Sequence, residues 1–71
     1  MSEGGKTLST PAEILQVALR KEENAFRFYD NLLNAPKADF VRDLIERLRD
    51  EEAKHVRLIQ KEIVKFSLGR G

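Results

Sequence analysis

Apolar residues recur at steps of three and four along two stretches of this chain, with a short break between them. In the first stretch, the repeating positions are Leu15, Ala18, Leu19, Glu22, Ala25, Phe26, Tyr29, Leu32 and Leu33. This spacing places them on one face of an α-helix. Thr10 can cap that helix, Pro11 suits its first position, and Glu13 completes a capping box. The pattern predicts a helix over about residues 11–34, after a disordered arm of residues 1–9.

The second stretch begins after Asn34-Ala35-Pro36, where proline disfavours a helix at the preceding residue and suits the first turn of the next one. Its repeating positions are Val41, Leu44, Leu48, Glu52, His55, Ile59, Ile63 and Phe66. These predict a second helix over about residues 37–66, and a frayed terminus at residues 68–71. No strand pattern interrupts the two helices. The predicted fold is therefore all-α, an antiparallel helical hairpin over residues 10–67.

A single hairpin of this kind leaves part of the apolar face of each helix uncovered. A chain of 71 residues also buries only a marginal core. Two hairpins that pack together form a four-helix bundle, and a two-fold dimer is the simplest closed arrangement. The chain has no cysteine, so disulfides and thiolate metal sites are excluded. We therefore expect a homodimer or a larger homo-oligomer.

The charge pattern and the hydropathy of the chain argue against two classes of partner. Charged residues make up 35% of the chain, yet its formal net charge is only +1. Mixed signs at this density indicate solvated helix faces, so we expect no nucleic-acid partner. No apolar run reaches membrane-spanning length, and the first residues have no apolar core of a signal peptide. These features predict a cytoplasmic protein that does not bind membranes.

Two glutamates interrupt the apolar stripes, and a buried carboxylate is costly unless it has a partner. In an antiparallel hairpin, residues at equal height have numbers with a constant sum. Glu22 and Glu52 average to position 37, at the predicted turn, so both lie at one level, about 20 Å from the turn. His55 follows Glu52 by one helical turn on the same face. Three potential metal ligands are thus predicted to converge.

A two-fold dimer doubles this set to four carboxylates and two imidazoles. One Glu from each of two helices, with Glu-x-x-His from each of the other two, is the ligand set of a di-iron or di-manganese carboxylate site in a helix bundle. Two divalent ions balance the charge of four carboxylates. Oxygen and imidazole ligands suit iron or manganese, and zinc also fits. The sequence therefore predicts two iron ions per dimer, with manganese or zinc as alternatives.

The sequence leaves some of these assignments open. Glu51 precedes His55 by four residues and competes with Glu52 for the ligand role, because the stripe alone does not separate them. Glu23 competes with Glu22 but lies off the first stripe. Tyr29 lies two turns beyond Glu22 on the same face. It can serve as a core residue with a hydrogen-bonded hydroxyl, or as a donor close to the metal ligands.

Two segments of the chain carry a family resemblance. They are Glu22-Glu23-Asn24-Ala25-Phe26-Arg27-Phe28-Tyr29 and Asp50-Glu51-Glu52-Ala53-Lys54-His55. Both resemble helices of the ferritin-like superfamily, in particular of rubrerythrin and bacterioferritin, over roughly residues 10–66. The resemblance implies a ferritin-like four-helix bundle with Glu22, Glu52 and His55 as di-iron ligands. It thereby favours Glu52 over Glu51.

The chain departs from full rubrerythrins because it carries one helix pair instead of two and lacks their cysteine-ligated iron domain. The extra glutamate associated with rubrerythrin's peroxide chemistry has no counterpart, so the resemblance does not extend to peroxidase activity. In its half-length format the chain is similar to encapsulated ferritins, whose two-helix subunits build a ferroxidase site across a dimer. A terminal peptide directs those proteins into encapsulin shells. Residues 66–69 are similar to such a peptide, and a frayed helix end explains them equally well.

The resemblance implies an oxidoreductase of ferroxidase type that handles iron or oxidative stress in the cytoplasm or inside a protein compartment. Glu22 would be a terminal ligand, Glu52 would bridge the two metals, and His55 would complete each coordination sphere. The main alternative is a non-enzymatic helical-hairpin module for oligomerisation. A small nucleic-acid-binding or regulatory protein is a third hypothesis, against which the intermixed acidic residues argue.

Overall fold

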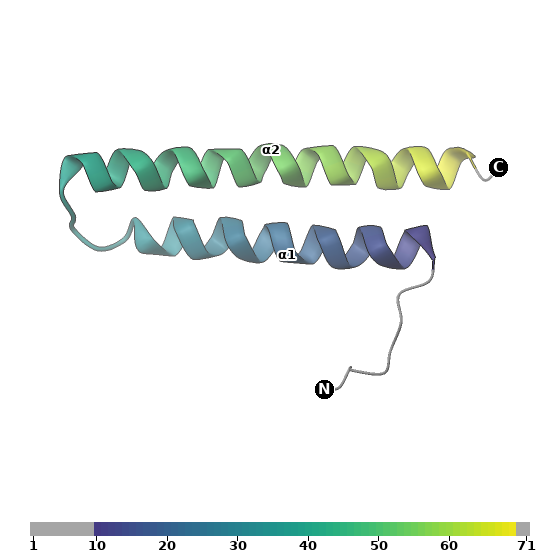
Figure 1. The fold of residues 1–71 in the computed structure, drawn as a ribbon, viewed down its shortest axis with the longest axis horizontal. Helices are drawn as coiled ribbons and strands as arrows, with labels where there is room; N and C mark the ends of the chain where they lie inside the picture. The colour runs from purple at the N-terminus through teal and green to yellow at the C-terminus, as the bar shows by residue number, and fades with distance from the viewer. Residues whose placement is uncertain (1–9, 70–71) are drawn as a thin grey trace, which may run out of the picture.

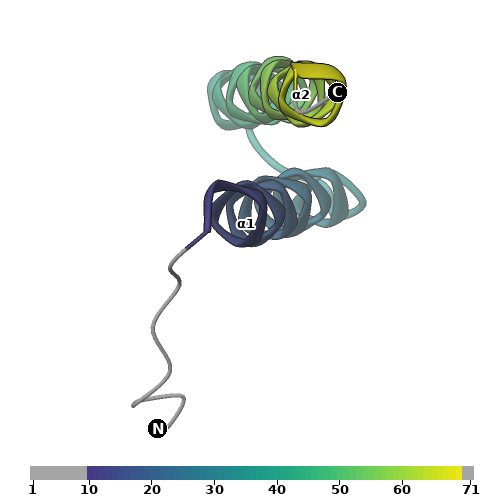
Figure 2. The ribbon, with the colours of Figure 1, turned by 90° about the vertical axis from the view of Figure 1, so that its right-hand side faces the viewer.

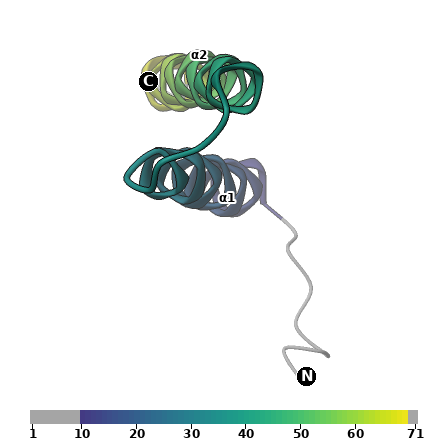
Figure 3. The same ribbon diagram turned by 90° about the vertical axis from the view of Figure 1, so that its left-hand side faces the viewer.

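The computed structural model describes residues 10–69, which form two antiparallel helices joined by a short turn (Figure 1). Helix α1 spans Pro11–Leu32 and helix α2 spans Asp39–Gly69. Viewed from either end, the helices run side by side as a single layer (Figures 2 and 3). The predicted all-α helical hairpin is confirmed. Neither helix has a stretch long and apolar enough to cross a membrane, within residues 10–69.

Helix α1 begins with the capping box expected from its sequence. The Thr10 hydroxyl accepts a hydrogen bond from the Glu13 backbone N–H at 3.1 Å, and the Glu13 carboxylate accepts one from the Thr10 N–H at 3.3 Å. Pro11 occupies the first helical position, where its missing N–H costs nothing. These contacts satisfy two of the backbone donors that a helix start leaves unpaired.

The turn ends α1 with a lysine that no sequence pattern singled out. The Lys37 ammonium group donates hydrogen bonds to the carbonyls of Leu32 and Ala35. A positive charge at this position satisfies carbonyls that α1 leaves unpaired and complements its negative end. Helix α2 begins at Asp39, and the Ala38 carbonyl before it accepts hydrogen bonds from the backbone N–H groups of Val41 and Arg42.

The helix bounds differ from the sequence-based ranges by two or three residues. Helix α1 ends at Leu32 rather than at about residue 34, and α2 starts at Asp39 rather than at about residue 37, because the intervening residues form the turn and its lysine cap. Helix α2 also continues to Gly69, so residues 66–69 belong to its last turn. The predicted arm of residues 1–9 and the final residues 70–71 lie outside the described residues.

Very little of the hairpin is buried. Within residues 10–69, Ile45 is the only buried residue. The large apolar side chains that remain exposed are Ile14, Phe28, Leu32, Phe40, Leu44, Leu48, Leu58, Val64 and Leu68. Two helices in contact cover one stripe on each other and leave the flanking positions open, so this exposure is the direct result of the hairpin architecture.

Most of these exposed apolar residues share one side of the hairpin. On a helical wheel drawn at about 100° per residue, the glutamate of each helix serves as the reference, Glu22 for α1 and Glu52 for α2. Seven of the nine exposed residues lie roughly 40–120° from that glutamate, all in the same direction of rotation. Because α1 and α2 are antiparallel, these two sides point in one direction. We call this side the ligand face. Its large apolar residues are Ile14, Phe28, Leu32, Phe40, Leu44, Leu48 and Leu58, and it also carries His55 and the charged residues Lys21, Glu51 and Glu62. Val64 and Leu68 fall outside it.

Candidate metal centre

Two glutamates and the histidine meet between the helices. Glu22 comes from α1, and Glu52 and His55 come from α2. His55 Nδ1 lies 3.3 Å from a carboxylate oxygen of Glu22 and 3.3 Å from one of Glu52. One ligand atom from each residue lies within 4.8 Å of the other two, and the part of the chain that the structure describes contains no other such group of three. We call Glu22, Glu52 and His55 the triad.

The triad lies at the middle of both helices. In α1, residues 11–21 precede Glu22 and residues 23–32 follow it, which is eleven residues against ten. In α2, residues 39–51 precede Glu52 and residues 56–69 follow His55, which is thirteen residues against fourteen. The equal height of Glu22 and Glu52 predicted from the turn is therefore what brings the two helices' acids together.

The triad is partly shielded and partly open to water. The side chain of Glu52 is 19% exposed, that of Glu22 is 32% exposed and that of His55 is 49% exposed. Glu22 and Glu52 lie closest to the helix contact, whereas His55 projects with the apolar residues of the ligand face. The triad is therefore accessible from this one side of a single chain.

The three groups change one another's protonation. The hydrogen bond between the two carboxyl groups raises the pKa of Glu52 and lowers the pKa of Glu22. Desolvation by burial raises the pKa of both carboxyl groups. It therefore adds to the shift at Glu52 and opposes the shift at Glu22. Hydrogen bonds to Glu52 and then to Glu22 raise the pKa of His55. As the pH falls, protonation of the two acids therefore begins at Glu52, and His55 is more readily protonated than usual.

Neither rival ligand joins the triad. Glu51 lies on the same side of α2 as Leu44 and Leu58 and pairs with Lys54 at 3.4 Å. Glu23 lies on the opposite side of the hairpin from the ligand face. Tyr29 has its ring against Phe28, with ring centroids 5.4 Å apart in an edge-to-face arrangement. Among the described residues, its hydroxyl forms no hydrogen bond to the triad.

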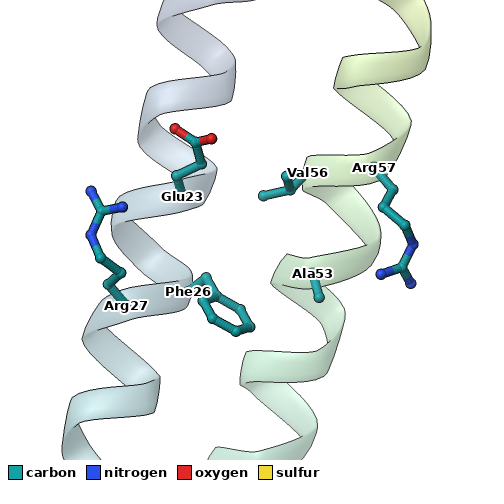
Figure 4. Close-up of a pocket in the computed structure, with 6 residues that line it drawn as sticks. All are labelled: Glu23, Phe26, Arg27, Ala53, Val56 and Arg57. Atoms are coloured by element: carbon teal, nitrogen blue, oxygen red, sulfur yellow. The ribbon is translucent and has the colours of Figure 1, made fainter.

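The side of the hairpin opposite to the ligand face carries a shallow groove of about 420 Å³ (Figure 4). Phe26 and Val56 point towards each other between the helices, with Ala53 beside them. The charged residues at its edges are Glu23, Arg27 and Arg57. Its lining has one carboxylate and no imidazole, so it does not offer a second metal site. Sequence analysis did not anticipate this groove, since all of its lining residues except Phe26 lie off the two stripes.

The triad's donor set suits a divalent metal ion. Two carboxylates offset the charge of one such ion, and carboxylate oxygens with one imidazole nitrogen are ligands that iron, manganese and zinc accept. Three protein ligands leave coordination positions open, as in metal sites that exchange ligands or substrates. On the ligand face the triad is open to water at His55, whose side chain is 49% exposed.

Comparison of the sequence with models of known protein families gives a match. A family model described as Rubrerythrin matches residues 13–71. The chain belongs to the rubrerythrin family. No curated protein and no solved structure matched. The rubrerythrin match spans nearly all of α1 and the whole of α2, including the triad. Rubrerythrin family members generally bind iron, in agreement with the resemblance seen in the sequence and with the donor set of the triad.

Proposed function

We propose that two copies of this chain bind a pair of iron ions between them and oxidise Fe²⁺ in a ferroxidase-type reaction. The observation that carries the proposal is the meeting of Glu22, Glu52 and His55 at the centre of a largely uncovered apolar face. Two carboxylates and an imidazole per chain give four carboxylates and two imidazoles per pair, which matches the ligand set of di-iron helix bundles.

The position of the triad supports pairing through the ligand face. The triad lies at the middle of the hairpin's length. A two-fold axis at this height, at right angles to the helices, would therefore make the two hairpins overlap over nearly their whole length. The same axis would bring the two triads together. Burial of apolar side chains stabilises by about 25 cal/mol per Å², so the full overlap also gives the largest stabilisation available to this face.

In this proposal each residue of the triad has a separate role. Glu22 is a terminal ligand, Glu52 bridges the two ions, and His55 completes each coordination sphere. Fe²⁺ is the substrate, and each ion gives one electron to dioxygen or peroxide and leaves as Fe³⁺. The clustered carboxylates attract the cation and favour its higher charge.

Protons compete with a metal ion for the triad. A proton on Glu52 or on His55 would occupy an atom that the metal ion would bind. We therefore expect metal affinity to fall as pH falls through the raised pKa of His55. Titration of the affinity for Mn²⁺ against pH measures this effect, with His55→Gln as the variant in which the dependence is weakened.

The decisive variant is Glu52→Ala, with Glu51→Ala as a matched control at the neighbouring position. We expect Glu52→Ala to lose stoichiometric iron binding and the oxidation of added Fe²⁺, because it removes the bridging carboxylate. Glu51→Ala should keep both, since Glu51 pairs with Lys54 instead. Iron bound at two ions per two chains by Glu52→Ala would overturn the assignment.

Tyr29 is the proposed source of a transient electron or of a hydrogen bond close to the site. It lies on the same face of α1 as Glu22, two turns away, and is partly buried. In this role, Tyr29→Phe should slow iron oxidation and leave iron stoichiometry unchanged. An unchanged oxidation rate would assign Tyr29 to packing alone.

The uncovered ligand face also supports a second candidate function, a non-enzymatic module for oligomerisation. In that case the triad would provide polar contacts between copies. Protein purified without chelator would then contain no transition metal, and its melting temperature would not respond to added Fe²⁺ or Mn²⁺. An encapsulin-like shell as partner and a cytoplasmic location stay predictions, which co-purification with a shell protein and cell fractionation would test.

A further inference from the structure

The triad is already assembled within one chain. The contact between His55 and Glu22 joins α2 to α1, and the contact between His55 and Glu52 lies within α2. Neither depends on a second copy. Three donor atoms within 4.8 Å of one another in a single hairpin are close enough to contact one ion after small side-chain movements.

The triad is open to solvent on the ligand face of the single hairpin. His55 is 49% exposed and lies among the apolar residues of the ligand face, with Leu48 and Leu58 on either side of it along α2. Pairing through this face would cover His55 together with its apolar neighbours. An ion therefore reaches the triad most directly before the second copy arrives.

Electrostatics favour the same order. Two metal-free hairpins would bring four carboxyl groups into one apolar interface, where like charges close together are costly. An ion bound to each triad first removes that repulsion. Its open coordination positions would then face the second copy, whose carboxylate can replace water.

We propose that a single hairpin captures one divalent metal ion, and that the captured ion then promotes pairing through the ligand face. This inference rests on the proposed function, because it describes how the same site is filled. By linkage, the factor by which metal strengthens pairing equals the factor by which pairing strengthens metal binding. Metal availability would therefore control the oligomeric state of the protein.

The first test separates capture from pairing. The variant Leu44→Gln/Leu58→Gln makes the ligand face polar on both sides of the triad without adding a charge or a ligand. Val64→Gln is the matched control, because Val64 is 55% exposed, close to the 57% of Leu58, but lies off the ligand face. Native mass spectrometry with Mn²⁺ counts ions per chain, and circular dichroism reports whether each variant is helical.

We expect the double variant to be a monomer that holds one Mn²⁺ per chain, and to lose the ion when Glu52→Ala is added. Monomers without an ion, beside wild-type pairs that hold two, would overturn the inference and leave the proposed function standing. Wild-type protein that binds no metal would instead overturn the proposed function itself.

A second test uses the wild-type chain, in case the double variant does not fold or still pairs. Sedimentation measures the dissociation constant of the pair with Mn²⁺ and with chelator. We expect Mn²⁺ to strengthen pairing by about tenfold or more, within the usual range of coupling between two binding events. An unchanged dissociation constant would overturn metal-promoted pairing.

Discussion

The two sides of this hairpin are built from the same helices and differ in what they leave exposed. The ligand face carries seven of the nine exposed large apolar residues, and the triad opens onto it. The opposite side carries a groove edged by Glu23, Arg27 and Arg57, and an ion pair between Asp30 and Arg49 at 3.1 Å that joins the helices. The ligand face is therefore the side through which the proposed pairing would take place.

The largest expected effect is a change in the strength of pairing when an exposed apolar residue of the ligand face is replaced. Leu58→Gln should weaken pairing strongly, because a fully buried leucine stabilises by about 1.5–3 kcal/mol and a two-fold pair contains it twice. Val64→Gln should leave pairing unchanged. Sedimentation of the metal-loaded protein compares them. Equal weakening by both variants would mean that the two sides do not differ as described.

A substitution at the start of α1 lies outside both the ligand face and the groove. It therefore serves as a reference for the stability of the hairpin itself. Thr10→Ala removes the hydroxyl that accepts the Glu13 N–H, and loss of such a cap costs about 1 kcal/mol. We expect lower stability to denaturant with unchanged metal stoichiometry. Thr10→Ser retains the hydroxyl and should behave like the wild type. A change in metal stoichiometry in Thr10→Ala would show that the triad depends on the helix end.

A smaller effect is expected at the ion pair on the groove side. Asp30→Asn should reduce stability only slightly, because exposed ion pairs contribute little. The carboxylate of Asp30 is 53% exposed and the side chain of Arg49 is 29% exposed. Denaturation at low and high salt measures the contribution, which should shrink at high salt. A loss of several kcal/mol would make this pair a main support of the hairpin.

The smallest effect is the pH dependence of the metal-free protein. Folding raises the pKa of His55, so its contribution to stability is present below the ordinary value of 6.5 and is lost as pH rises through the folded value. Glu52, whose pKa is also raised, acts in the same direction at lower pH, and Glu22 acts in the opposite one. The melting temperature should therefore fall slightly above pH 6.5, and His55→Gln should remove that fall.

The hairpin and the meeting of the triad could be predicted because both depend on spacing. Helical periodicity places Glu22 and Glu52 on their stripes, and the turn sets their heights. Spacing did not decide between Glu51 and Glu52. That choice came from the family resemblance. In the structure the carboxylate of Glu52 lies beside His55, whereas that of Glu51 contacts Lys54.

Other features depend on contacts that a periodic pattern does not encode. The Lys37 cap sets where α1 ends, and it comes from a side chain that reaches back across the turn. The groove that Phe26 and Val56 line is formed by residues of both helices. Its shape depends on the relative height of these residues, which is set by how the two helices pack. The pattern also does not show how small the buried core is, with Ile45 as the only buried residue between positions 10 and 69.

The central claim is that the triads of two copies share a pair of metal ions. A crystal structure of the iron-loaded protein, with anomalous scattering measured at the iron edge, tests it directly. We predict two peaks about 3.5–4 Å apart, with Glu22, Glu52 and His55 of both copies around them. Peaks held within one chain only, or located away from the triad, would contradict the claim.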